Sequence, residues 1–343
     1  MLRKTGTFIL KDLKYMSYNH RFTITITLLL IYMLTITCKR EPLVSERPAG
    51  YIVAWGYDIV GQVSDAPEGD DFVAVSAGER HSLALRKDGT LAAWGKGDSY
   101  NQVRDTPVED GFVAISAGHI HNIALREDGT IVAWGGDTAR FATAANRAVG
   151  GQVSATPETD GFVAISAGDG HNLALHEDGT LKAWGMNLNN QVTDTPLEGG
   201  FVAISAGSHH NLALRENGTI VAWGSDTSGL VSDTPVEDGF VSIAAGARHN
   251  LALREDGTIV AWGWDLQNEV SDTPEESGFV SISVGYSHSI AMREDGTLVS
   301  WGWDRSDFGQ MSNTPEDDGF VAVSAGNLHN LAIRLPDNEV RNE

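Results

Sequence analysis

The chain has 343 residues, 41% of them hydrophobic, with 38 glycines and 10 prolines, which is enough apolar material for a packed core with many tight turns. Its 24 basic and 46 acidic residues give a net charge of -22, which argues against nucleic acid as a partner because such a surface repels phosphate backbones. The single cysteine, Cys38, excludes an intrachain disulfide and a cysteine-rich metal site.

Residues 1–38 predict an export signal. The apolar stretch from Phe22 to Thr37 is preceded by basic residues, among them Lys4, Lys11, Lys14 and Arg21. It is shorter than the roughly 20 residues that a membrane-spanning helix needs, and a basic region before a short apolar region is typical of a secretory signal. Met16 is an alternative start that would give the signal a more usual length.

Cys38 follows the apolar stretch directly, where a bacterial lipoprotein carries its lipidated cysteine. The preceding Leu34-Thr35-Ile36-Thr37 resembles a lipobox loosely. Lipidation at Cys38, a cleaved signal and an uncleaved anchor are therefore three open outcomes, of which we favour lipidation. We expect an exported protein, either an envelope lipoprotein associated with the membrane through its N-terminus or an extracellular protein, with residues 39–50 as a linker.

From residue 51 to residue 343 one sequence pattern repeats seven times. Its marker is a Trp-Gly pair, spaced by 39, 40, 50, 39, 39 and 39 residues, that begins at Trp55, Trp94, Trp134, Trp184, Trp223, Trp262 and Trp301. The long spacing reflects an insertion between Gly136 and Gly151. A repeat of about 39 residues is typical of propellers and solenoids.

Each repeat predicts three short strands. In one copy these are FVAISAG (112–118), HNIALR (121–126) and TIVAWG (130–135), followed by a variable loop and the connector QVSATP (152–157). The segments are β-branched or aromatic and bounded by turn residues, and none shows a helical period. An Asp-Gly pair before the third segment predicts a two-residue hairpin turn in which both residues take a positive φ.

The two ends of the repeat region predict a closed ring. The chain enters at YIVAWG (51–56) without the two segments that precede it elsewhere, and it leaves after FVAVSAG (320–326) and HNLAIR (329–334) without a third. The first and last segments therefore complete one shared blade. The fold class that follows is all-β, a closed seven-bladed β-propeller without exposed strand edges.

The string AG-x-x-H-x-L-A-L-x-x-D-G, followed by the Trp-Gly pair, resembles the repeat of the regulator of chromosome condensation family. This resemblance covers about 293 residues and implies a seven-bladed propeller. The short spacing and the Gln-Val-x-x-x-Pro connector are most similar to compact bacterial members such as β-lactamase inhibitory protein II, a secreted binder. Eukaryotic repeats that act on a small nuclear GTPase carry extra connector residues that this chain lacks, so the resemblance does not imply nucleotide exchange.

Chain direction assigns the loops to two faces. The bottom face holds the Asp-Gly hairpins and the acidic Pro-x-Glu-Asp-Gly turns, which we interpret as a solvated face rather than a cation-binding one. The top face holds the turns after AG and the loops after Trp-Gly, where the repeats differ. Exposed aromatic residues are enriched at binding hot spots. Our candidates for partner binding are Tyr57, Tyr100, Phe141, Trp264, Tyr286, Trp303 and Phe308.

The residues that repeat in each blade predict structure rather than chemistry. The histidines His81, His121, His171, His210, His249, His288 and His329 occupy one strand position, and we expect each to bond a neighbouring backbone group. We expect no catalytic residue, cofactor or metal site, because no nucleophile elbow, phosphate loop or zinc motif is present.

The sequence therefore predicts a monomeric, exported, membrane-anchored propeller that binds a protein through its top face and is not an enzyme. One alternative is a secreted inhibitor of an extracellular enzyme. The other is a lyase or hydrolase with a site at the centre of the ring, which a tight polar cluster there would favour over a broad aromatic patch.

Overall fold

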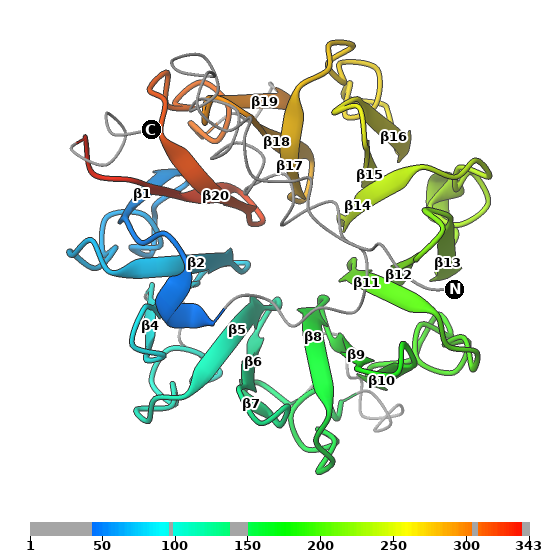
Figure 1. Ribbon diagram of the computed structural model, residues 1–343, viewed down its shortest axis with the longest axis horizontal. Helices are drawn as coiled ribbons and strands as arrows, with labels where there is room; N and C mark the ends of the chain where they lie inside the picture. Colours follow the sequence, from blue (N-terminus) through cyan, green and yellow to red (C-terminus); the bar gives the residue numbers. More distant parts are fainter. Residues whose placement is uncertain (1–42, 96–98, 138–149, 304–307, 338–343) are drawn as a thin grey trace, which may run out of the picture.

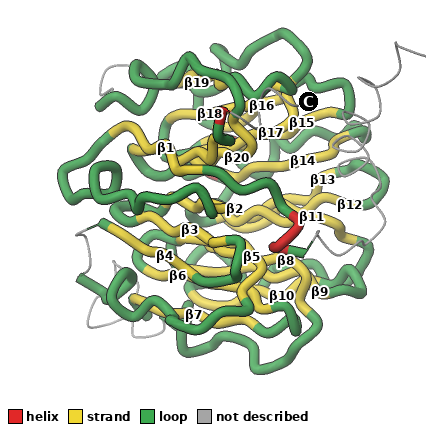
Figure 2. The backbone as a smooth tube through the Cα atoms, turned by 60° about the vertical axis from the view of Figure 1, so that its left-hand side comes forward, coloured by secondary structure: helices red, strands yellow, loops and turns green. Residues whose placement is uncertain are grey.

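The computed structural model of the chain describes residues 43–95, 99–137, 150–303 and 308–337. They form a ring of seven three-stranded sheets, which we call blades I to VII (Figure 1). Apart from two short 3-10 turns, each regular element is a strand (Figure 2). The prediction of an all-β seven-bladed propeller is confirmed.

The strands of each blade follow the three predicted segments. Blades I to IV contain β2 (Phe72–Ala77), β3 (Ser82–Arg86), β4 (Leu91–Trp94); β5 (Phe112–Ala117), β6 (His121–Arg126), β7 (Ile131–Gly135); β8 (Phe162–Ala167), β9 (His171–His176), β10 (Leu181–Gly185); and β11 (Phe201–Ala206), β12 (His210–Arg215), β13 (Ile220–Gly224). Blades V to VII contain β14 (Phe240–Ala245), β15 (His249–Arg254), β16 (Ile259–Gly263); β17 (Phe279–Val284), β18 (His288–Arg293), β19 (Leu298–Gly302); and β20 (Phe320–Ala325), β21 (His329–Arg334), β1 (Tyr51–Gly56). The 3-10 turns are η1 (Val44–Glu46) and η2 (Thr227–Gly229).

Within a blade the strands are antiparallel, and the FVAISA-type strand lies nearest the centre of the ring (Figure 1). The middle strand is covered on both sides, and its burial pattern is therefore continuous rather than alternating: Asn122 to Leu125 of β6 are all buried. A bulge follows the first residue of the innermost strand, as between Phe112 and Ala114.

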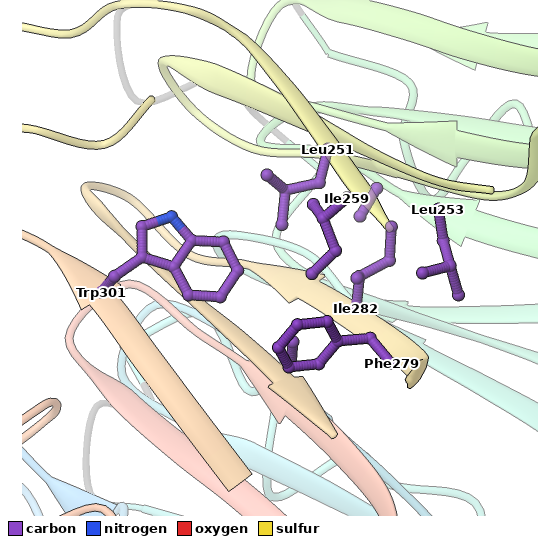
Figure 3. Close-up of a cluster of buried hydrophobic side chains, with 8 residues drawn as sticks. Leu251, Leu253, Ile259, Phe279, Ile282 and Trp301 are labelled. Atoms are coloured by element: carbon purple, nitrogen blue, oxygen red, sulfur yellow. The ribbon is translucent and has the colours of Figure 1, made fainter. Parts of the chain in front are cut away.

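The hydrophobic core lies between blades rather than inside one blade. At the junction of blades V and VI, Leu251 and Leu253 pack with Phe279, Ile282 and Trp301 (Figure 3). Similar clusters form at the other six junctions. A single blade cannot bury its own apolar faces, so the blades are stable only as a ring.

The ring closes through blade VII, as the two chain ends predict. Strand β1 pairs with β21 from Tyr51 opposite Arg334 to Gly56 opposite His329. On the other side, Leu331 of blade VII packs with Phe72 and Trp94 of blade I. The first and last segments therefore share one blade and complete the seventh junction.

The turn between the second and third strands differs from the predicted two-residue hairpin. Arg86 N donates to Thr90 O, so three residues form the loop, and only Gly89 among them takes a positive φ, 83°. Asp88 accepts hydrogen bonds from Thr90 N (2.9 Å) and Thr90 Oγ1 (2.7 Å) instead. The aspartate thus stabilises the loop through its carboxylate, and the glycine supplies the left-handed position.

Part of the segment predicted as a linker packs against the ring. Val44 of η1 is buried in the cluster between blades I and II, and Gly50 forms a bridge with Phe72. Within the described ranges no helix has the length and apolar character to cross a membrane. The predicted export signal and Cys38 lie outside the described residues.

Candidate partner-binding face

The structure supports the assignment of loops to two faces. Backbone hydrogen bonds join each loop after Trp-Gly to the turn before the histidine of the same blade. Trp264 N donates to Arg248 O and Trp303 N donates to Ser287 O, both at 2.9 Å. At the opposite face the hairpin loops meet the connectors, as where Glu127 N donates to Gly111 O (3.1 Å).

The seven repeated histidines form a belt around the ring. The Nε2 atom of each histidine lies within hydrogen-bond distance of an asparagine or serine side chain in the next blade. The pairs are His81–Asn122 (2.6 Å), His121–Asn172 (2.7 Å), His171–Asn211 (2.7 Å), His210–Asn250 (2.6 Å), His249–Ser289 (2.7 Å), His288–Asn330 (2.8 Å) and His329–Ser82 (3.0 Å). The predicted structural role is therefore confirmed, but the expected backbone partner was wrong, because the partner is a side chain of the neighbouring blade.

In the five pairs that contain an asparagine, this residue orients the histidine. Asn122 Nδ2 donates to Gln102 O (2.7 Å), the carbonyl that also accepts from Trp134 Nε1 (3.0 Å). The asparagine Oδ1 consequently faces the imidazole, so Nε2 of His81 carries the proton and donates it. The repeated His, Asn and Trp residues thus belong to one network that links blades, which explains why they recur together.

The glycine of the AG-x-x-H string leaves room for the imidazole. A Cβ at Gly118 would lie 2.5 Å from the His121 ring and 2.7 Å from Gly168 O of the next blade. Both contacts are too close for any side chain. The repeated glycine is therefore required by the belt.

Five of the belt histidines are neutral in the folded protein at pH 7. Burial lowers the pKa of His121 and of His210 to about 4. It lowers the pKa of His171, His249 and His329 to about 3. A neutral imidazole suits a structural hydrogen bond, and within the described residues no group of three His, Cys, Asp or Glu side chains could hold a metal ion.

The repeat symmetry is broken most clearly where blade V meets blade VI. Elsewhere a serine accepts a hydrogen bond from the next blade, as Ser205 Oγ does from Ala245 N (2.9 Å). Blade V has Ala244 at this position, so the equivalent bond to Val284 N cannot form. The glutamine that recurs in the connectors is replaced by leucine before blade V and by a glutamate before blade VI, at Leu230 and Glu269.

Above this junction three side chains of the top face contact one another. The Arg248 guanidinium lies over the Tyr286 ring (4.5 Å to the centroid) and over the Trp264 ring (5.6 Å). Arg248 Nη2 donates to Tyr286 Oη (2.8 Å). Arg248 and Trp264 belong to blade V and Tyr286 to blade VI, so the cluster spans the junction. We call these three residues the Arg248 cluster.

Beneath the cluster lies a buried carboxyl group. Glu269 is fully buried, and its Oε2 accepts from Gln267 N (3.0 Å), whereas its Oε1 has no partner in the described structure. Burial raises the pKa of Glu269, the nearby Asp265 carboxylate adds to the rise, and Arg248 opposes it. No sequence prediction singled out Arg248 or Glu269, although both depart from the repeat.

Three of the predicted binding residues lie close together. Trp264 and Tyr286 meet in the Arg248 cluster, and Trp303 lies beside it, since its backbone bonds Ser287, the residue after Tyr286. The rings of Trp264 and Trp303 are half-buried, and their Nε1 atoms are buried without a partner in the described residues. Both indoles therefore fold partly onto the blades and present only part of their surface to a partner.

Of the remaining candidates, two contact each other. Tyr57 and Phe308 make an edge-to-face contact with centroids 4.9 Å apart, and Phe308 is half exposed. Tyr100 is exposed in the loop after blade I and, among the described residues, makes no ring contact with the other candidates. Phe141 lies in the inserted segment, outside the described residues.

A polar pair lies in the turns nearest the centre of the ring. His119 Nε2 lies 3.0 Å from Glu79 Oε2, and the side chains are only 14% and 11% exposed. Arg80 lies 3.8 Å from the other Glu79 oxygen. This pair joins blades I and II at the top, the region that the enzyme alternative would use, and it sits away from the Arg248 cluster in the order of blades.

The bottom face is acidic but partly neutralised. Arginines at the ends of the middle strands lie over phenylalanine rings and pair with connector carboxylates, as Arg126 does with Phe112 (5.4 Å to the centroid) and Glu109 (2.7 Å). Hydrogen bonds from Thr130 hold the pKa of Asp128 below its usual range. Three connector side chains are almost fully exposed, Val108 (94%), Leu197 (95%) and Val236 (95%). The sequence analysis overlooked these apolar residues on a face that it described only as acidic.

Comparisons with known proteins agree with this architecture. Five segments match the family described as "Regulator of chromosome condensation (RCC1) repeat", residues 72–102, 162–191, 201–230, 240–268 and 279–310. No curated protein matches the sequence.

Solved structures resemble the ring at low sequence identity. Prp20p from Saccharomyces cerevisiae, studied for its binding to Gsp1p and histones, is 19% identical with a TM-score of 0.67, over 86% of this chain and 94% of its own. Human WBSCR16 is 16% identical with a TM-score of 0.63, over 83% and 99%. The ectodomain of the Physcomitrella patens receptor kinase CR4 is 23% identical with a TM-score of 0.59, over 75% and 69%. At these identities the likeness concerns the fold.

Proposed function

Because the chain is a β-propeller built of RCC1-type repeats, we propose that it is a non-catalytic binding protein that recognises a protein partner through its top face. The observation that carries this proposal is the Arg248 cluster. It joins the side chains of two blades on the one face where the repeats differ, above the junction where the interior also departs from the repeat. Aromatic residues and arginine are the residue types most enriched at interface hot spots.

The features of the free ring are consistent with a site kept for a partner. Arg248 and the exposed Leu266 (77%) and Tyr286 (37%) offer a charge beside apolar surface. The unpaired buried Nε1 atoms of Trp264 and Trp303 each cost stability, about 1–3 kcal/mol for a buried unsatisfied polar group. Departures from local optimisation are expected at functional sites.

The test compares capture of envelope proteins by four forms of the full chain. The wild type should capture a partner, and Trp264→Ala and Trp303→Ala should each weaken binding of that partner at least tenfold. Truncating a hot-spot residue typically costs about 2 kcal/mol or more of binding free energy. The control is the double variant Glu255→Gln and Asp256→Asn on the bottom face, which should bind as the wild type does. If the control variant loses the partner and the tryptophan variants keep it, the binding site lies on the bottom face and the proposal is wrong.

We propose further that the chain is exported and held at the cell envelope through a lipid on Cys38. The supports are the basic residues before the apolar stretch and the place of Cys38 at its end. One acyl chain binds membranes only weakly, so stable anchoring expects the full modification of the cysteine.

Labelling with a palmitate analogue distinguishes the three outcomes for the N-terminus. A lipoprotein takes up the label, and Cys38→Ser moves it to the soluble fraction. A cleaved, unlabelled and soluble chain indicates a secreted protein, whereas an unlabelled, full-length and membrane-bound chain indicates an uncleaved anchor. Either of the last two results contradicts the proposal that Cys38 is lipidated.

A further inference from the structure

Arg248 is bound differently from the arginines of the bottom face. Those arginines lie over a phenylalanine and also pair with a carboxylate, as Arg254 does with Phe240 (5.3 Å) and Glu237 (2.8 Å). Arg248 lies between two aromatic rings, and within the described residues it makes a single hydrogen bond, to Tyr286 Oη, and no ion pair. In a chain with a net charge of -22, this arginine therefore keeps an unpaired charge.

The remaining donors of Arg248 are available to a ligand. A guanidinium has five N–H groups in a fixed planar fork, and one of them is used by Tyr286. The two rings restrict the orientation of the guanidinium before any partner arrives, so less conformational entropy is lost on binding. Such a fork matches an oxyanion that accepts two parallel hydrogen bonds.

The surroundings favour a carboxylate over a phosphate. Two carboxyl groups lie in this region: Glu269 interacts electrostatically with Arg248 and with the carboxylate of Asp265, the residue after Trp264. A phosphate with a charge near -2 would be repelled by these groups about twice as strongly as a carboxylate with a charge of -1. Tyr286 contacts the guanidinium, and Leu266 follows Trp264 by two residues; both are exposed and suit an apolar neighbour of that carboxylate.

We propose that Arg248 determines the specificity of the top face by binding a carboxylate of the protein partner, either an Asp or Glu side chain or a chain-terminal carboxylate, that lies next to an apolar side chain. The inference rests on the proposed function, because it names the group that the partner presents to the same site. Trp264 and Tyr286 act as positioning residues that restrict the orientation of Arg248, and Glu269 places a carboxyl group within electrostatic reach of it.

The probe is a library of random peptides selected for binding to the full chain. Selected peptides are resynthesised with each Asp or Glu changed to Asn or Gln, and with a free or an amidated C-terminus. Their affinities are then measured for the wild type, Arg248→Gln, Arg248→Lys and Trp264→Ala. The matched control is Arg126→Gln, which removes an arginine that also lies over an aromatic ring but on the bottom face.

We expect the peptides to share an acidic group beside an apolar residue. Neutralising that group should weaken binding to the wild type at least tenfold, and Arg248→Gln should cause the same loss with no further loss for the neutralised peptide. Arg248→Lys should not restore the affinity, since lysine lacks the planar fork. Arg126→Gln should leave the affinity unchanged, and a peptide with phosphoserine in place of the acidic residue should bind more weakly. Sensitivity to amidation or to the side-chain change identifies which carboxylate is bound.

Two results overturn the inference and are distinguishable. If Trp264→Ala weakens peptide binding but Arg248→Gln and neutralisation leave it within twofold, or if phosphoserine strengthens it, the top face binds peptides without reading a carboxylate. If no peptide is selected, or if Trp264→Ala and Trp303→Ala also leave binding intact, the proposed function fails with it.

Discussion

The residues that recur in each blade and the residues that occur once lie in different parts of the ring. The recurring His, Asn and Trp side chains are buried in the interior, where their hydrogen bonds connect each blade to the next. The residues of the Arg248 cluster occur once and lie on the top face of blades V and VI. The interior requires the same geometry seven times, whereas recognition of one partner requires a site that is unlike its copies.

The comparison also separates two kinds of polar burial. The belt histidines are bonded to the next blade through Nε2, as His121 is, and burial keeps that imidazole uncharged at pH 7, although its Nδ1 has no partner within the described residues. Glu269 is buried with one oxygen unpaired in the described structure, and burial raises its pKa, so it weakens the ring at neutral pH. Each of the following predictions changes one side of this comparison.

The largest effect is expected from removing residues 51–56. Without β1, blade VII loses the strand that pairs with β21, and Trp55 leaves the core cluster with Ile290 and Phe320. The cooperative thermal transition followed by circular dichroism should disappear. Removing residues 1–42 is the control and should leave the transition in place. A melting temperature within a degree or two of the intact ring after the first deletion would show that closure does not stabilise it.

The second effect is loss of stability between pH 7 and pH 5. Five of the belt histidines, among them His171 and His210, have a folded pKa of about 3 to 4 and an unfolded pKa of about 6.5. Below pH 6.5 the unfolded chain therefore binds more protons than the folded ring, and each such histidine costs about 1.4 kcal/mol per pH unit until the pH reaches its folded pKa.

The measurement is the urea midpoint from pH 7.5 to pH 5. The midpoint should fall steeply as the pH falls over this range. The bottom-face aspartates affect stability only at lower pH, because hydrogen bonds hold the pKa of Asp88 and Asp128 below the ordinary value of 3.8. A midpoint that stays constant between pH 7 and pH 5 would contradict neutral, buried histidines.

The third effect contrasts two tryptophans. Trp223 is buried, donates to Gln191 O (3.1 Å) and packs with Leu173 and Phe201, so Trp223→Ala should lower the free energy of unfolding by about 3–5 kcal/mol. Trp264 is half-buried and contributes a cation–π contact, so Trp264→Ala should cost about 1 kcal/mol or less. Denaturant titration measures both, and equal losses would remove the distinction between recurring and unique tryptophans.

The smallest expected effect is a gain in stability from the variant Glu269→Gln. Glu269→Gln restores the residue found at the equivalent connector positions Gln62, Gln102, Gln152, Gln191 and Gln310 and removes a buried charge. Because the folded pKa of Glu269 is raised, its carboxylate destabilises the ring above that pKa, and the penalty disappears as the pH falls through it. We expect a stabilisation of about 1 kcal/mol at pH 7 that shrinks toward pH 5. A loss of stability at pH 7 would mean that the carboxylate is used in the free ring.

The fold was predictable because the same strand and turn pattern occurs seven times in the sequence. The Trp-Gly spacing gave the number of blades, and the incomplete segments at the two ends gave the pairing of β1 with β21. The partner of His81 was not predictable in the same way, since Asn122 becomes its neighbour only when blades pack side by side. The three-residue loop at Asp88 also depends on backbone hydrogen bonds that an Asp-Gly pair does not fix.

The candidate site was only partly predictable. Aromatic residues in variable loops identified Trp264 and Tyr286, but not the arginine that holds them together. The signal was present: Arg248 lies in a variable turn one blade before Tyr286, and loops of neighbouring blades meet on the same face. The burial of the Trp264 and Trp303 indole nitrogens could not be read from the sequence, because it depends on how each loop folds back onto its blade.

The most direct test of partner binding through the top face places a photo-crosslinking amino acid at two matched positions of the full chain, one on each face, in the cells that produce it. Leu266 lies beside the Arg248 cluster and is 77% exposed, and Val236 lies on the bottom face and is 95% exposed. p-Benzoylphenylalanine in place of Leu266 should crosslink a discrete protein partner, and Arg248→Gln in the same chain should reduce that product. The same amino acid in place of Val236 should give no such product. A partner crosslinked from position 236 and absent from position 266 would contradict the account.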